Sequence, residues 1–278
     1  MWIVFAGYCL IVGSEWVLPA VSGAIRGLVF AVVGIVAAIL SGRSSWPGVG
    51  SLGRVALAAV LLVGVPEVAV GWGLQHVASS LWVVVLTVVP AMVVLVVAQS
   101  SGDGVRRLMG PALAGLGGIL LIVPAGVPGS VMGRVALTLL ILCAVAIAIA
   151  SVWIHRLLQG FGLAQAVAVF CLANALVLVG WGAFDGAAGW GLSGWGWVAA
   201  LVEGAEVVLL VVLLRGMSPV RFGARYLVIP LLIVVEGYVV LRPEVTVRMG
   251  FGVALLAGSA AVLLLSRGVD ERGGLSLR

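Results

Sequence analysis

The sequence predicts an all-α polytopic membrane protein in which ten transmembrane helices form two inverted five-helix repeats, and its composition is the first reason. Of the 278 residues, 63% are hydrophobic and only 9% are charged, whereas soluble domains carry about 25% charged residues. One soluble domain cannot hide so large an apolar fraction in its core, because its surface still needs polar cover. The composition therefore excludes a water-soluble globular protein.

Ten apolar runs are the second reason, because each comes close to the roughly 20 residues that a spanning helix needs. The first run is barely long enough, and Pro19 separates it from the second almost without a loop. The ten ranges are 2–18, 21–40, 55–74, 81–98, 108–123, 135–154, 163–181, 197–214, 226–241 and 247–265.

An internal repeat is the third reason. A shift of 140 residues places Pro90 on Pro230 and gives nine identities in 31 aligned positions, where this composition gives roughly three by chance. The repeat divides the chain into a first five-helix half, 1–128, and a second, 129–278. An odd number of spans in each half forces the halves into opposite orientations, which is the inverted-repeat plan of secondary transporters.

The placement of Arg predicts the orientation, because the cytoplasmic loops of membrane proteins carry an excess of positive charge. With the N-terminus inside, eleven of the fifteen Arg residues fall on the inner side and four, Arg26, Arg134, Arg242 and Arg248, toward the outside. We therefore expect a multi-pass protein of the inner (plasma) membrane with both termini in the cytoplasm. Because the Arg residues are scattered singly among apolar runs, no nucleic-acid partner is expected.

Each half contains a Pro-bearing helix followed by a Gly-rich helix, and the first half has a short acidic loop between them. The segments are GLQHVASSLWVVVLTVVP (73–90), GD (102–103) and MGPALAGLGGILL (109–121), then ALTLLILCAVAIAIASVWIHRLL (136–158), SPVRFGARYLVIPLLIVVEGYVVLRPE (218–244) and GVALLAG (252–258). They resemble the drug/metabolite transporter superfamily, in its EamA-type branch. The resemblance implies ten helices, a central cavity lined mainly by helices other than the fifth and tenth, and export of small metabolites by alternating access.

The start of the chain departs from that family pattern. The family's first helix usually carries a Trp-Gly pair well before an Arg that opens the second helix, whereas here Gly13, Ser14 and Trp16 stand close to Arg26. The first hairpin is therefore expected to be shortened or clipped.

Four carboxylates lie inside the expected spans, at Glu67, Glu203, Glu206 and Glu236. A charged side chain costs about 2.5 to 3.5 kcal/mol at the centre of a membrane helix, so four lipid-facing carboxylates cost roughly 10 kcal/mol together. That is comparable with the net stability of a whole fold. We expect these groups to face the bundle interior, to form pairs or to be protonated, and they are candidates for binding substrate or protons.

Glu67 and Glu206 are related by the repeat, since the shift of 140 residues places Glu67 one residue from Glu206. Two acids related in this way would flank one central site. The alternative for Glu67 is close helix packing around a protonated acid, because Gly64 and Gly71 line its helix face.

Glu203 and Glu206 stand three residues apart, which places them on one helix face within reach of each other. Like charges this close in a low dielectric cannot both ionise easily, and this predicts a proton-binding step. The alternative is that Glu203, which is nearer the outer surface, reaches water.

Two further polar residues inside the spans are binding candidates. Glu236 lies deep in its span and is expected to line the cavity or to pair across helices. Asn174 is the sole Asn of the sequence, and an interhelical hydrogen bond is its favoured interpretation over substrate binding. Glu15 and Arg26 lie near the outer ends of adjacent helices and are expected to form an ion pair without a transport role.

Pro90 and Pro230 are expected to kink the fourth and ninth spans, because each removes a backbone donor from its helix. Carbonyls freed there could instead serve a ligand. The ranges 110–118 and 250–258 carry a small residue at every fourth position, which allows close helix packing. A homodimer face is the less favoured use of this pattern.

Together these features predict a secondary transporter, not an enzyme, that exports a small metabolite such as an amino acid, an amine or a drug-like cation by alternating access. Its partners are the substrate, the lipid bilayer and coupled protons. The alternatives are a flippase for a lipid-linked substrate, with a cavity open sideways to lipid, and, less favoured, an intramembrane enzyme, which requires clustered His, Asp, Ser or Cys at one depth. The spacing of Cys and His predicts no metal site, and no cofactor is expected.

Overall fold

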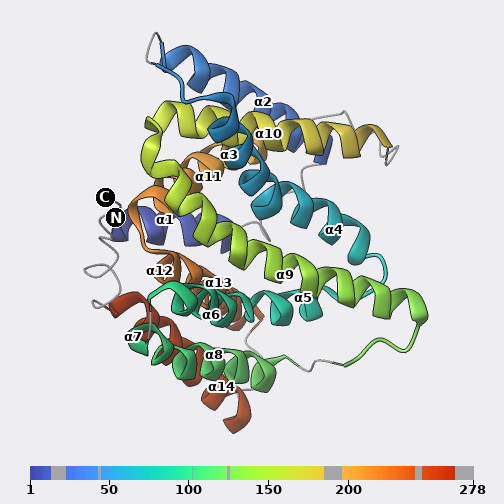
Figure 1. The fold of residues 1–278 in the computed structure, drawn as a ribbon. Coiled ribbons are helices and arrows are strands. Elements are labelled where there is room, and N and C mark those ends of the chain that lie inside the picture. The colour runs from blue at the N-terminus through green and yellow to red at the C-terminus, as the bar shows by residue number, and fades with distance from the viewer. Residues whose placement is uncertain are drawn as a thin grey trace. The chain divides into compact units, whose positions relative to one another are not determined.

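The structure, a computed structural model, describes residues 1–13, 23–42, 45–101, 103–123, 126–184, 196–241 and 246–266 (Figure 1). Regular structure in these ranges is helical throughout. By length and composition, seven helices of this part of the chain can cross a membrane, and two further apolar helices, α1 (Trp2–Gly13) and α8 (Met109–Ile122), are shorter. The all-helical, membrane-capable architecture predicted from the sequence is therefore confirmed.

The helices lie where the apolar runs predict them. The range 2–18 begins as α1, which extends to Gly13, and its remaining residues lie outside the described ranges. The range 197–214 is α11 (Gly196–Gly216), which carries two of the predicted site residues. A crossing of the membrane by all ten segments stays a prediction.

The chain divides into two compact units, each built from two separate stretches, and the first consists of Met1–Gly71 and Trp153–Gly216. It contains α1, α2 (Gly23–Leu40), α3 (Val49–Ala59), a π-helical turn (Val60–Gly64), most of α4 (Val65–Gly73), the end of α9 (Val131–Leu157), a 3-10 turn (Leu158–Gly160), α10 (Leu163–Phe184) and α11.

The second unit consists of Trp72–Val152 and Met217–Arg278. It contains α5 (Ser79–Leu86), α6 (Val89–Ser101), α7 (Asp103–Arg106), α8, most of α9, α12 (Pro219–Gly223), α13 (Arg225–Leu241) and α14 (Val247–Leu265). Each unit draws helices from both 1–128 and 129–278, so the compact units do not coincide with the sequence halves.

In the first unit, α2 packs along α10, and Figure 1 shows the two helices side by side. A Cβ atom on Gly27 would lie 2.8 Å from Cγ2 of Val179, and one on Gly34 would lie 2.8 Å from Cγ of Leu172. A step of seven residues forward along α2 thus matches a step of seven backward along α10. The helices are antiparallel, and glycines let their backbones approach closely.

In the second unit, α8 packs along α14 in the same manner (Figure 1). A Cβ atom on Gly118 would lie 2.7 Å from the carbonyl oxygen of Gly252, and one on Gly252 would lie 2.7 Å from that of Gly118. Gly115 faces Ser259 further along, so this pair is also antiparallel. Of the small residues at every fourth position, Gly118 lies in this contact, whereas a Cβ atom on Gly110, Gly250 or Gly258 would meet nothing within 4 Å. The close approach therefore depends mainly on Gly115, Gly118 and Gly252, not on the full pattern.

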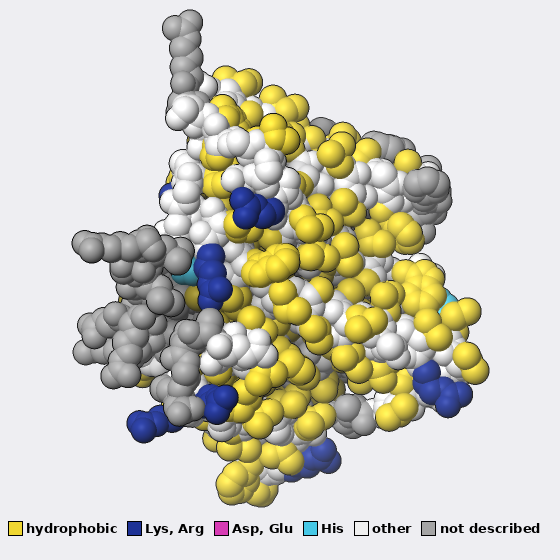
Figure 2. Space-filling view, in the orientation of Figure 1, with side chains coloured by type: hydrophobic (Ala, Val, Ile, Leu, Met, Phe, Trp, Pro, Cys, Tyr) yellow, Lys and Arg dark blue, Asp and Glu magenta, His cyan; other side chains and the backbone are white. Residues whose placement is uncertain are grey.

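Large apolar side chains remain exposed on the outer faces of the helices. Ile3, Leu176 and Val240 are each more than 70% exposed. On the face shown in Figure 2, hydrophobic side chains cover most of the described surface and Arg side chains form separate small patches. Contiguous apolar surface of this kind is unfavourable in water and suits contact with lipid.

Candidate functional site

An ionic cluster inside the first unit joins three helices that are far apart in sequence. The guanidinium of Arg26, on α2, forms an ion pair with Glu67 on α4, with Nη1 and Oε2 2.5 Å apart. Its other terminal nitrogen, Nη2, donates a hydrogen bond to Oε1 of Glu203 on α11. One guanidinium therefore bridges two carboxylates, which together with it carry a net negative charge when both are ionised.

The three side chains differ in exposure. Those of Arg26 and Glu203 are only 17% and 10% exposed, whereas that of Glu67 is 39% exposed. Mutual pairing offsets the cost of placing charges in an apolar interior. Glu67 is the accessible member of the cluster and is the group that a solute can reach first.

Close packing brings α11 and α2 together beside the ionic cluster. A Cβ atom on Gly204 would touch Val29 and Val33 of α2, at 3.4 Å from each. Glu206 lies one turn beyond Glu203 on the same face of α11 and is half-buried. The structure thus places Glu67, Glu203 and Glu206 in one unit. Their expected part in binding substrate or protons stays a prediction.

Asn174 is fully buried on α10 and uses its side chain to hold the π-helical turn. Its Oδ1 accepts a hydrogen bond from the backbone N–H of Gly64 at 2.8 Å, and its Nδ2 donates one to the carbonyl of Phe170 at 2.9 Å. This is an interhelical hydrogen bond, the interpretation favoured from the sequence.

The other sequence candidates lie in the second unit. Glu236 is exposed on α13, and no ion pair joins it to another residue in the described ranges. Pro90 is the second residue of α6, directly after a break at Thr87 and Val88, and Pro230 lies within α13. These three residues therefore lie outside the ionic cluster.

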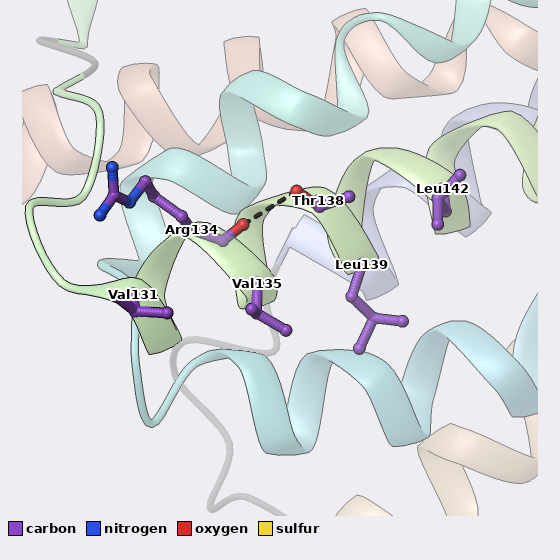
Figure 3. Close-up of a pocket in the computed structure, with 6 residues that line it drawn as sticks. All are labelled: Val131, Arg134, Val135, Thr138, Leu139 and Leu142. Carbon is purple, nitrogen blue, oxygen red and sulfur yellow. Dashed lines mark hydrogen bonds between the residues drawn. The ribbon is translucent and has the colours of Figure 1, made fainter.

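A cavity of about 420 Å³ lies along α9 in the second unit and contains none of the predicted site residues (Figure 3). Figure 3 shows its lining on successive turns of the helix, with the Thr138 hydroxyl donating to the Arg134 carbonyl at 2.9 Å. The lining residues are Val131, Arg134, Val135, Thr138, Leu139 and Leu142. The cavity is mainly apolar, and Arg134 is the charged residue in its lining.

Within the described ranges, no three His, Cys, Asp or Glu side chains come together in a way that could hold a metal ion. Cys9, Cys143 and Cys171 are buried and are not joined by disulfide bonds. The ionic cluster itself is thus built from one guanidinium and two carboxylates.

For Arg26 the sequence named one partner, Glu15, which lies outside the described ranges, so that pair stays a prediction. The structure adds an ionic contact of Arg26 with Glu67 and Glu203, which sequence reasoning missed. Comparing depths in the membrane across helices could have found this contact.

No protein-family model matches the sequence, and no curated protein matches it either. The resemblance to the drug/metabolite transporter superfamily therefore stays a prediction.

Twenty-nine chains of solved structures resemble this one. One of them, described only as the crystal structure of a protein, superposes with a TM-score of 0.76 at 19% sequence identity, over 95% of this chain and 97% of the other. At that identity the likeness shows a shared fold alone, and the fold extends over nearly the whole of both chains.

Proposed function

We propose that this chain is a secondary membrane transporter that moves a small metabolite such as an amino acid, an amine or a drug-like cation by alternating access. The observation that carries the proposal is the ionic cluster of Arg26, Glu67 and Glu203, in which the helices that carry Arg26 and Glu67 are long and apolar enough to cross a membrane. Ionisable groups at membrane depth are costly, and where they occur they commonly line substrate or ion pathways.

The charge balance of the cluster favours a cationic substrate or a proton. Among the described residues, two carboxylates of the cluster meet one guanidinium. The excess of acidic groups attracts positive charge, and the exposed side of Glu67 offers it a point of contact. Export and proton coupling belong to this proposal.

Helix packing supports two inverted five-helix repeats. A shift of 140 residues moves α2 onto 163–180 within α10, and moves α8 onto 249–262 within α14. Each of these helices packs antiparallel against its own counterpart. Repeats of opposite orientation, related by a two-fold axis in the membrane plane, produce this arrangement.

Transport in liposomes with an imposed pH gradient tests the proposal. The purified chain is reconstituted and offered amino acids, polyamines and tetraphenylphosphonium, and the parent is compared with Glu67→Gln and Glu206→Gln. We expect at least one cationic compound to move, and we expect both variants to lose proton dependence. Undiminished proton dependence in both variants would contradict proton coupling, and movement of none of the compounds would contradict the substrate class.

A lipid-linked substrate flippase is the second candidate, and the cavity along α9 favours it. Its leucines and valines suit an acyl chain, and the Arg134 guanidinium suits an anionic headgroup. Translocation of a fluorescent phospholipid in the same liposomes, measured by dithionite quenching, separates the two functions. A flippase quickens the loss of inner-leaflet fluorescence and is slowed by Arg134→Gln, whereas a transporter of soluble cations does neither.

A further inference from the structure

We propose that Asn174 is a positioning residue, which holds Glu67 against Arg26 by anchoring the π-helical turn to α10. The inference deepens the proposed function, because it concerns the same ionic cluster. It assigns Asn174 a task other than binding substrate or protons.

Both the oxygen and the nitrogen of the Asn174 carboxamide form hydrogen bonds. Its oxygen accepts from the N–H of Gly64, and its nitrogen donates to the carbonyl of Phe170. The side chain has no exposed surface, so a solute cannot reach it without separating the helices. Asn174 therefore acts on the cluster through the backbone of the neighbouring helix.

The π-helical turn needs such an anchor because two features disturb the helix there. Pro66 has no N–H and cannot complete the usual helical hydrogen bond with the carbonyl four residues earlier. The N–H of Val65 bonds to the carbonyl of Val60, five residues back, and that of Gly64 bonds to Asn174. A π-helical bulge shifts the face of every later residue, and such bulges occur frequently at functional sites.

The π-helical turn sets the helix face on which Glu67 lies. It lies three residues beyond Gly64, so the two share one face of the helix. A Cβ atom on Gly64 would lie 2.9 Å from Oδ1 of Asn174 and 3.3 Å from Cγ1 of Val177. The glycine thus permits the close approach that fixes the start of α4 against α10.

The helix α10 also fixes the position of Arg26. Gly27, the next residue on α2, packs against Val179, and a Cβ atom there would lie 2.8 Å from its Cγ2 atom and 2.9 Å from its backbone nitrogen. Asn174 and Val179 are five residues apart on α10, a rise of about 7.5 Å. Both partners of the Arg26–Glu67 pair are therefore held by one stretch of α10, whereas Glu203 is carried by α11.

Carbodiimide labelling tests this inference without knowledge of the substrate. Dicyclohexylcarbodiimide reacts with uncharged carboxyl groups in apolar surroundings, so a carboxylate paired with Arg reacts slowly. The full chain in liposomes is treated with the reagent, and the modified Glu67 and Glu203 are quantified separately by peptide mass spectrometry. Arg26→Gln provides the reference for cluster carboxyls released from the guanidinium.

We expect Asn174→Ala to raise the labelling rate of Glu67 about tenfold, a typical coupling between contacting residues, and to leave that of Glu203 unchanged. Asn174→Asp keeps an oxygen that can accept from Gly64 and should restore slow labelling. Adding Asn174→Ala to Arg26→Gln should give no further increase at Glu67. Ser151→Ala, which removes a buried hydroxyl bonded within its own helix, is the matched control.

Unchanged labelling of Glu67 in Asn174→Ala, or an equal rise at Glu67 and Glu203, would overturn the inference, because the second result describes general loosening. Asn174→Ser, which also fails to reach Gly64, repeats the measurement if Asn174→Ala does not fold. Labelling does not depend on transport. A chain that transports nothing but shows the selective rise at Glu67 would contradict the proposed function and keep the positioning role.

Discussion

Arg26 and Glu203 form an ion pair although 177 residues separate them along the chain. The contact joins α2, from the first half of the sequence, to α11, from the second. Both side chains are largely buried, so their pairing compensates part of the charge that each carries. The stability of the first unit should therefore respond strongly to the loss of either partner.

Arg26→Gln should lower the free energy of unfolding by about 3 to 5 kcal/mol, because it leaves a buried carboxylate without its cation. Unfolding in mixed micelles with increasing dodecyl sulfate, followed by tryptophan fluorescence, measures this change. Arg54→Gln is the control, since Arg54 is exposed and bonds only weakly to Gly50 at 3.3 Å. A loss no larger than that of the control would contradict the structural importance of the pair.

Glu67→Gln and Glu203→Gln should differ in their effect on stability. Glu203 is the more buried, and Glu203→Gln should cost about 3 kcal/mol because the guanidinium keeps its charge in an apolar setting. Glu67 is more exposed, and its replacement should cost about 1 kcal/mol or less. The same unfolding assay gives the order, and the reverse order would refute the burial that separates the two acids.

Gly64→Ala should destabilise the fold by about 1 to 3 kcal/mol, because the new methyl group must displace Asn174 or Val177. Gly71→Ala is a control on the same helix, since a Cβ atom there meets nothing within 4 Å. Thermal unfolding in detergent should show a lower midpoint for the first variant and no loss for the second. Equal midpoints would mean that α4 and α10 are not in close contact at Gly64.

Gly118→Ala should destabilise the second unit, because a Cβ atom there would lie 2.7 Å from a backbone oxygen of α14 that cannot move alone. The expected loss is about 1 to 3 kcal/mol, as for other overpacked contacts. Gly117→Ala, one residue earlier, points into open space and should be neutral. Protection of α14 amides from hydrogen exchange reports the contact directly, and unchanged protection in Gly118→Ala would exclude it.

The positions of the helices were accessible from the sequence because apolar runs of this length have few alternatives to a membrane helix. The carboxylates of the first unit were also accessible, since intramembrane acids are few and costly. The depth of Arg26 in its expected span also indicates its contact with Glu67 and Glu203. At 1.5 Å per residue, Arg26, Glu203 and Glu67 lie about 7.5, 9 and 10.5 Å from the outer ends of their expected spans.

The π-helical turn could not be predicted in the same way. Pro66 indicates a local bend, but it does not say where the N–H of Gly64 finds its acceptor. That acceptor is Asn174, 110 residues later. Only the packing of α10 against the turn brings the two together, and no periodicity in the sequence records that contact.

The central claim is that the cluster around Glu67 selects positively charged solutes. Counterflow in liposomes loaded with a transported cation tests this claim most directly. Entry of putrescine and of the anion succinate, which are similar in size, is compared in the parent, Glu67→Gln and Arg134→Gln. We predict that the parent and Arg134→Gln take up the cation at least about tenfold faster than the anion, which corresponds to about 1.4 kcal/mol. Glu67→Gln should lose this preference. Equal entry of cation and anion into the parent, or an unaltered preference in Glu67→Gln, would contradict the account.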